Sequence, residues 1–176
     1  MKVIKFEEIN STNEYAKTAY QELDNNTVII AKHQTAGKGR LGRTWLDKDA
    51  NSALFTILIK DHLNTSNISN LTLLMATSVL KVLNNITPGF SIKWPNDIMV
   101  HAYKVCGILL EAVTKNKIDC VIIGVGINTN TESFSEELKV KANSLKNLLD
   151  TEIDNQKLLL EIEEEFEKDL ELLSTN

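Results

Sequence analysis

The sequence is poor in the residues that build covalent or metal-held scaffolds. It has two cysteines, Cys106 and Cys120, and three histidines among 176 residues, with neither a Cys-x-x-Cys pair nor a histidine cluster. Disulfide frameworks and zinc sites need closer spacing of these residues. We therefore interpret both cysteines as buried thiols in a reducing cytosol, assign structural roles to His33, His62 and His101, and predict no metal site made by the protein alone.

Long apolar runs and a basic excess are also absent. Met1 to Ile9 alternates charged and apolar residues, so it does not have the form of a signal peptide, and no apolar stretch is long enough to span a bilayer. The formal net charge is -5, which argues against a general nucleic-acid binder. Neither DNA nor a membrane is expected as a partner, and the protein is predicted to be cytoplasmic.

The length and composition indicate one ordinary globular domain. Hydrophobic residues make up 43% and charged residues 24% of the chain, a balance that argues against disorder. At 176 residues the chain is long enough to bury a core and short for two domains. No repeat or linker divides it.

Patterns of apolar residues predict a mixture of strands and helices. Ser11-Thr12-Asn13-Glu14 has the form of a capping box, with Ser11 as the N-cap of a first helix. Helical spacing predicts a long helix over Asn67 to Ile86 and an amphipathic, glutamate-rich helix from Leu158 to Leu173. Strands are expected over Lys2–Ile9, Thr27–Ala31, Ser52–Ile59, Phe90–Lys93, Ile98–Val100, Val105–Val113 and Asp119–Ile127, with a loop over Thr129–Lys141.

One segment, Gln34 to Trp45, concentrates three glycines and three cations. Glycine lets backbone amides approach an anion closely, so the segment predicts binding of a phosphate, with a solvated turn as the alternative. Gly37-x-Gly39-x-x-Gly42 matches the dinucleotide fingerprint, but that fingerprint needs a helix to follow, and a strand is expected there. A Walker loop is excluded because Gly39 stands where Ser or Thr should follow the lysine. We expect a loop that connects two strands.

Two further segments carry the residue types of a binding site. Lys93-Trp94-Pro95-Asn96-Asp97 indicates a tight turn, because proline restricts the residue before it and Asn and Asp favour turns. Gly124-Val125-Gly126-Ile127-Asn128 ends the most apolar strand. Glycine inside a strand marks either the close approach of a ligand or another chain segment, or a bulge.

Taken together, the glycine-rich cationic loop, the Lys93 to Asp97 turn, the run Lys104-Val105-Cys106-Gly107-Ile108-Leu109 and the strand ending at Asn128 resemble the biotin protein ligase family in the same order. The resemblance implies an α+β fold, a mixed and largely antiparallel β-sheet flanked by helices, related to class II aminoacyl-tRNA synthetases. It implies an enzyme that makes biotinyl-5'-AMP from biotin and ATP with Mg²⁺ and transfers biotin to a lysine of a biotin carboxyl carrier protein.

The resemblance also implies roles for single residues. Arg40 would hold the adenylate, and Lys104 would contact the biotin carboxylate and the phosphate. Asp97, with Lys93 at the other end of the turn, would orient or deprotonate the incoming lysine. Trp45 would offer a face to adenine, although core packing also accounts for a tryptophan. The implied biotin set is Ser11, Thr12, Asn13, Gln34, Gly37, Lys38, Gly39, Arg40, Lys104 and Gly107, and the implied ATP set is Arg43, Trp45, Asn96 and Asn128.

The chain departs from the family pattern after Trp45, where Asp47-Lys48-Asp49-Ala50-Asn51 replaces a glycine that is frequent in the family. Residues 1–176 are expected to form a single catalytic domain, with neither an N-terminal helix-turn-helix nor a C-terminal β-barrel. A homodimer is left open. The alternatives are a lipoate-protein ligase and a protein that binds biotin or biotinyl-adenylate with poor transfer.

Overall fold

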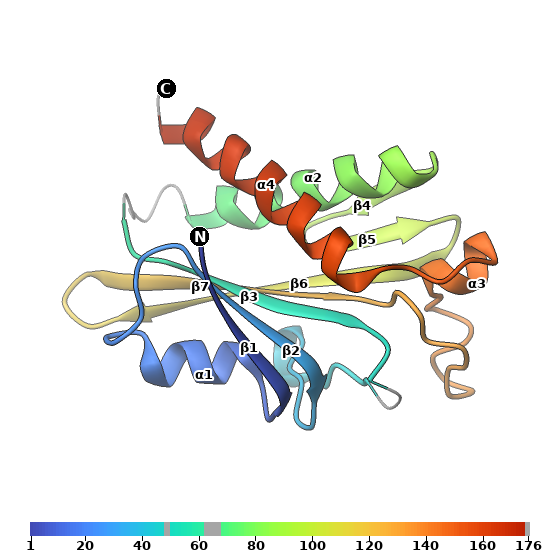
Figure 1. The fold of residues 1–176 in the computed structure, drawn as a ribbon, viewed down its shortest axis with the longest axis horizontal. Helices are drawn as coiled ribbons and strands as arrows, with labels where there is room; N and C mark the ends of the chain where they lie inside the picture. The colour runs from blue at the N-terminus through green and yellow to red at the C-terminus, as the bar shows by residue number, and fades with distance from the viewer. Residues whose placement is uncertain (48–49, 62–67, 175–176) are drawn as a thin grey trace.

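The computed structural model describes residues 1–47, 50–61 and 68–174, which fold around one seven-stranded sheet (Figure 1). The strand order is β1-β2-β3-β7-β6-β5-β4. The strands are β1 (Lys2–Ile9), β2 (Thr27–Gln34), β3 (Ala53–Ile59), β4 (Phe90–Lys93), β5 (Asp97–Val100), β6 (Tyr103–Thr114) and β7 (Ile118–Ile127). The helices are α1 (Thr12–Ala19), α2 (Ile68–Ile86), α3 (Leu145–Leu149), α4 (Asn155–Ser174) and the 3-10 turn η1 (Arg40–Gly42).

The sheet is mixed and largely antiparallel, as predicted. Among the described strands, only the pair β1 and β2 is parallel, because α1 carries the chain back across the sheet between them, and the five other pairs are antiparallel. The very apolar β7 lies in the middle, between β3 and β6. Because β7 is buried on both faces of the sheet, its residues do not alternate between apolar and polar, and the strand is a nearly continuous hydrophobic run.

Helices cover the two faces of the sheet unequally. α2 and α4 pack on one face and on each other, whereas α1 lies on the opposite face (Figure 1). The larger core, under α2 and α4, includes Met75, Leu83, Ile162 and Phe166, all fully buried. A smaller core under α1 gathers around Ala16 and Ile29. α1 covers only part of its face, and the rest is left for the site described below.

Most element bounds agree with the sequence predictions, and the differences have physical causes. β2 runs three residues beyond the predicted Ala31, because its parallel pairing with β1 continues through the polar His33 and Gln34. The turn between β5 and β6 is tighter than predicted, with His101 in the left-handed region at φ 51°. The short helix α3 was missed, since five residues show little periodicity.

A few predictions fall on residues outside the described ranges, namely His62, Asn67 as the first residue of the long helix, Lys48 and Asp49; the side chain of Leu173 is likewise not described. In the described part of the chain, no helix has the length and apolarity needed to cross a membrane.

Candidate active site

The N-terminus of α1 directs three consecutive polar side chains onto the open face of the sheet. Ser11 is the N-cap, and its Oγ accepts a hydrogen bond from the Glu14 amide. The second half of the predicted capping box does not form. The Glu14 carboxylate instead makes an ion pair with Lys38, at 2.7 Å from its Nζ. Thr12 and Asn13 are buried although polar, and each is therefore expected to have hydrogen-bonding partners.

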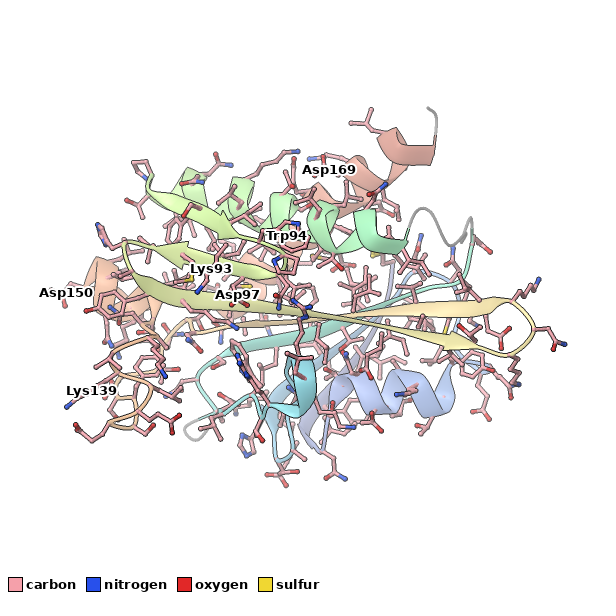
Figure 2. All side chains as sticks on the ribbon, turned by 180° about the vertical axis from the view of Figure 1, so that it is seen from behind. Lys93, Trp94, Asp97, Lys139, Asp150 and Asp169 are labelled. Carbon is pink, nitrogen blue, oxygen red and sulfur yellow. The ribbon has the colours of Figure 1, made fainter. Side chains whose placement is uncertain are left out.

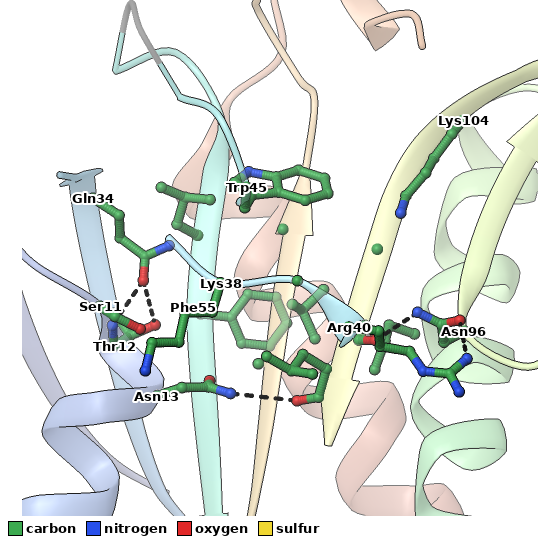
Figure 3. Close-up of a pocket in the computed structure, with 18 residues that line it drawn as sticks. Ser11, Thr12, Asn13, Gln34, Lys38, Arg40, Trp45, Phe55, Asn96 and Lys104 are labelled. Carbon is green, nitrogen blue, oxygen red and sulfur yellow. Dashed lines mark hydrogen bonds between the residues drawn. The ribbon is translucent and has the colours of Figure 1, made fainter. Parts of the chain in front are cut away.

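These partners form one connected network, of which Figure 3 draws the bonds between Thr12 and Gln34 and between Asn13 and Leu109. Gln34 Oε1 accepts hydrogen bonds from Thr12 N at 2.7 Å and from Thr12 Oγ at 3.0 Å. Thr56, fully buried on β3, has its Oγ 2.7 Å from both Thr12 Oγ and Asn13 Oδ1. Asn13 Nδ2 donates to Leu109 O at 3.4 Å and to Glu111 Oε2 at 3.0 Å. The network fixes which end of each amide faces the neighbouring cavity.

Three glycines make the floor of the site. Gly124 and Gly126 are two residues apart on β7, so they share a face, and Gly107 on β6 pairs directly with Gly126. A Cβ at Gly124 would lie 2.2 Å from Asn13 Oδ1, and one at Gly126 would lie 2.6 Å from Trp45 Cε2. The strand register is regular at all three glycines, so the bulge interpretation is wrong, and close approach of other side chains explains them.

Residues 35–45, here called the strap, cross above this floor between β2 and β3. The strap is a narrow hairpin in which Trp45 N donates to Gly37 O and Gly39 N donates to Arg43 O. A Cβ at Gly37 would lie 2.8 Å from Trp45 O, so glycine is required for this close pairing. The structure therefore confirms a strand-to-strand connection.

Two contacts fasten the strap to the rest of the protein. On the α1 side, Lys38 pairs with Glu14. On the other side, Arg40 Nη1 donates to Asn96 Oδ1 at 2.9 Å, while Asn96 Nδ2 donates to Ile108 O at 2.9 Å (Figure 3). The side chains of Lys38 and Arg40 thus reach opposite sides of the strap, toward α1 and toward the β4–β5 turn.

The strap roofs a cavity, partly open to solvent, between the N-terminus of α1 and the glycine floor. It is lined by nearly all of the residues predicted to bind biotin, Gly37 being the exception: Ser11, Thr12, Asn13, Gln34, Lys38, Gly39, Arg40, Lys104 and Gly107. Asn96, predicted to bind ATP, lines this cavity as well. Its apolar walls come from Leu54, Phe55, Ile108 and Val125.

A second, larger hollow adjoins the first. It is lined by Arg43, Lys93, Asp97 and Asn128, and Trp45 and Lys104 border both spaces. The segment 131–142 also lines this hollow, and the sequence predicted only a polar loop there. The signal available there was three apolar residues in a polar stretch, Phe134, Leu138 and Val140.

Lys104 occupies the boundary between the two spaces. Its Nζ lies 2.7 Å from Asp97 Oδ1 and 5.6 Å from the centre of the Trp45 ring. Lys93 on β4 lies directly opposite Asp97 on β5 in the strand register, so the two side chains share one face of the sheet (Figure 2). The indole Nε1 of Trp45 is buried and, among the described residues, has no acceptor. A buried donor without a partner is costly unless a ligand supplies one.

Both cysteines are buried, as predicted. Burial raises the pKa of the Cys106 thiol to about 12, even though the Lys104 charge acts in the opposite direction. Burial likewise raises the pKa of Cys120. Among the described residues, no three His, Cys, Asp or Glu side chains gather to hold a metal ion.

Comparison with known proteins identifies the family. The model of the biotin/lipoate A/B protein ligase family matches residues 5–128. The chain belongs to this family. Two biotin-ligase relatives of the chain are the bifunctional ligase/repressor BirA of Bacillus subtilis, 34% identical over 160 residues, and the biotin–[acetyl-CoA-carboxylase] ligase of Paracoccus denitrificans, 31% identical over 123 residues.

Those alignments include 86% and 68% of the chain but only 49% and 51% of the relatives, so the chain spans about half the length of the curated proteins it matches. The fold is that of the biotin protein ligase catalytic domain. The biotin protein ligase of Aquifex aeolicus in complex with biotin and ATP superposes with a TM-score of 0.86 at 33% identity, covering 97% of this chain and 70% of that one.

Proposed function

We propose that this chain is an ATP-dependent ligase that forms biotinyl-5'-AMP from biotin and ATP and transfers biotin to a lysine of a biotin carboxyl carrier protein. The observation that carries the proposal is the distribution of hydrogen-bond donors and acceptors in the strap-covered cavity. These polar groups complement the carbonyl and one of the two N–H groups of a cyclic urea.

Hydrogen bonds within the protein determine which donors and acceptors of Gln34, Ser11 and Asn13 stay free for a ligand. Gln34 Oε1 is occupied by Thr12, so the free end of this amide is its Nε2 donor, which has no acceptor among the described residues. Ser11 Oγ accepts from Glu14 N and keeps its O–H to donate. Asn13 uses its Nδ2 hydrogens on Leu109 and Glu111, which leaves a lone pair of Oδ1. Two donors and one acceptor therefore remain for a ligand.

The same pattern disfavours lipoate, the other substrate class in the family's name. A dithiolane ring has neither a carbonyl nor an N–H group, so it would leave the free groups of Gln34, Ser11 and Asn13 without partners in the cavity. Unsatisfied buried polar groups reduce binding strongly, by up to several orders of magnitude when a site is built around them. The apolar walls at Phe55 and Val125 suit the hydrocarbon part of either ligand and do not discriminate.

For adenylation, a carboxylate oxygen must attack the α-phosphorus of ATP, forming an O–P bond while the bond to the β-phosphate oxygen breaks and pyrophosphate leaves. Two anions meet in this step, so positive charge is needed between the two spaces. Lys104 borders both and supplies a compact charge, and Arg40 supplies a planar fork at the strap. Release of Lys104 from Asp97 to the substrate carboxylate would accompany binding.

Nucleotide binding falls to the larger space. Arg43 and Lys93 provide charge for the phosphates, Asn128 provides an amide, and the Trp45 ring provides a face for adenine. Mg²⁺ would enter with ATP, held mainly by phosphate oxygens and water, with Asp97 as the nearby carboxylate. Asn96 serves this site indirectly by holding Arg40.

In the transfer step, the amine of the acceptor lysine forms a bond to the acyl carbon, and AMP leaves. The amine must first lose a proton, and Asp97 is the carboxylate at the mouth that can accept it. The carrier protein as partner, the single catalytic domain over 1–176, cytoplasmic localisation and a homodimer stay predictions.

Biotin-dependent exchange of radioactive pyrophosphate into ATP tests the first half-reaction. We expect exchange with biotin and ATP, and none when lipoate replaces biotin. Labelling of one lysine in an added carrier domain tests the second half-reaction. Folded protein that binds biotin but exchanges no pyrophosphate would favour the binding-protein alternative, and exchange with lipoate alone would favour the lipoate ligase.

A further inference from the structure

Glu111 joins α1 to β6 through both of its carboxylate oxygens, and none of the roles above uses it. Oε2 accepts from Asn13 Nδ2 at 3.0 Å, and Oε1 accepts from Lys17 Nζ at 3.1 Å. Asn13 and Lys17 are four residues apart and so lie on one face of α1. Glu111 itself does not line the cavity, so its effect on a ligand must pass through Asn13.

The carboxylate decides which way the Asn13 amide faces. An ionised carboxylate only accepts hydrogen bonds, so the NH₂ end of Asn13 must face Glu111. A flipped amide would place Oδ1 at 3.0 Å from Glu111 Oε2 and at 3.4 Å from Leu109 O, three acceptors with no hydrogen between them. Thr56, the other neighbour, is a hydroxyl that can donate or accept, so it would tolerate either orientation.

We infer that Glu111, held by Lys17, is a positioning residue that fixes Asn13 with its acceptor toward the ligand and thereby makes the site require an N–H donor in the head group. The inference rests on the proposed function and deepens it, since it names the residue that sets the polarity of biotin recognition. It also explains why a charged residue reaches beneath α1, where an apolar side chain would pack at lower cost.

Glu111→Gln is the informative variant because it keeps the size of the side chain but replaces an obligate acceptor by an amide that can also donate. Asn13 is then free to adopt either orientation. Calorimetry with biotin alone, without ATP, should show binding weakened about tenfold, the value of about one hydrogen bond. The KM for ATP in pyrophosphate exchange should stay within about twofold of wild type, since the nucleotide space is untouched.

Two control variants distinguish the loss of Asn13 positioning by Glu111 from the mere loss of an ion pair. Glu165→Gln removes a comparable ion pair with Lys81, between α4 and α2 on the other face of the sheet, and should leave biotin binding unchanged. Lys17→Met removes the support of Glu111 but keeps the acceptor, so we expect a loss of only about threefold. Circular dichroism and thermal melting verify that each variant folds.

A second readout uses biotin analogues in which one or the other ureido N–H carries a methyl group. Wild type should lose about tenfold in affinity for the analogue methylated at the nitrogen facing Asn13, whereas Glu111→Gln should lose less than about threefold on the same change. A merely structural role for Glu111 would give the same loss in both proteins. That result, or unchanged biotin binding by Glu111→Gln, would overturn the inference and leave the proposed function standing. Failure of wild type to bind biotin would overturn both.

Discussion

Substitutions at two nearby glycines of β7 should affect different substrates. Gly124 lies under Asn13, and Gly126 lies under Trp45, although only one residue separates them on the strand. The proposed function places biotin recognition at Asn13 and nucleotide binding at Trp45. A single added methyl group at each glycine should therefore impair the binding of one substrate more than the binding of the other.

The size of the effect follows from the distances. A Cβ at Gly126 would lie 2.6, 2.8 and 3.1 Å from three atoms of the Trp45 ring, whereas carbon atoms pack at about 3.5 to 4.0 Å, so the ring must retreat by roughly 1 Å. Trp45 is the last residue of the strap, which can yield more readily than the central strand. We therefore expect a modest loss of stability, about 1 kcal/mol, and weakened adenine stacking, which raises the KM for ATP about tenfold.

At Gly124 the added Cβ would lie 2.2 Å from Asn13 Oδ1, so Gly124→Ala must displace the amide that we assign to the head group. Its KM for biotin should rise about tenfold, with the KM for ATP nearly unchanged. Each variant is thus the matched control for the other, with the same substitution on the same strand and face.

Pyrophosphate exchange with each substrate varied in turn measures both constants. Fluorescence in a Trp94→Phe background, which removes the exposed second tryptophan, reports directly on Trp45 and should change in Gly126→Ala but not in Gly124→Ala. The reasoning is refuted if the two variants show the same substrate dependence, or if Gly126→Ala leaves both Trp45 fluorescence and the KM for ATP unchanged.

Three further predictions concern the strap and the thiol. Arg40→Ala removes the tie to Asn96 and should let adenylate escape, so mass spectrometry should find more biotin on bystander lysines while pyrophosphate exchange continues; unchanged selectivity would contradict this. Lys38 lowers the pKa of Glu14 from 4.5, so the stability from this pair is present above that pH and lost as the pH falls through the lower folded-state pKa. The ion pair contributes at most about 1 kcal/mol because it is exposed. The difference in Tm between wild type and Glu14→Gln should therefore disappear in acid, and a difference that grows in acid would refute the ion pair's role in stability. With its pKa raised to about 12, Cys106 should resist iodoacetamide at about pH 8 until urea unfolds the protein, which peptide mapping would show.

Local patterns predicted most of the fold. β7 was recognisable because a central strand is apolar on both faces, and α4 because Leu158, Ile162 and Phe166 recur at helical spacing and are indeed buried. The end of β2 was missed because His33 and Gln34 are polar, and only their pairing with β1 extends the strand. α3 was missed because it is too short to show a period.

Much of the candidate site was also predictable, since Ser11, Gln34, Lys104 and Gly107 occur in motifs whose order the chain preserves. The supporting residues were not. Thr56 is an ordinary strand residue and Glu111 an ordinary glutamate until β3 and β6 are placed on either side of β7. Lys38, predicted from its loop to meet the ligand, also pairs with Glu14.

The helices and strands, the glycine-rich strap and the types of group available to a ligand follow from local sequence, because they depend on periodicity and on backbone preferences within a few residues. Which of these groups remain free for a ligand depends on contacts between distant segments. The Asn13–Glu111 and Arg40–Asn96 bonds join residues 98 and 56 positions apart, and they exist because the strand order brings β6 and the β4–β5 turn to the strap and α1. A hydrogen-bonding group that a distant partner occupies is no longer offered to substrate, so the polarity of the site is a property of the fold.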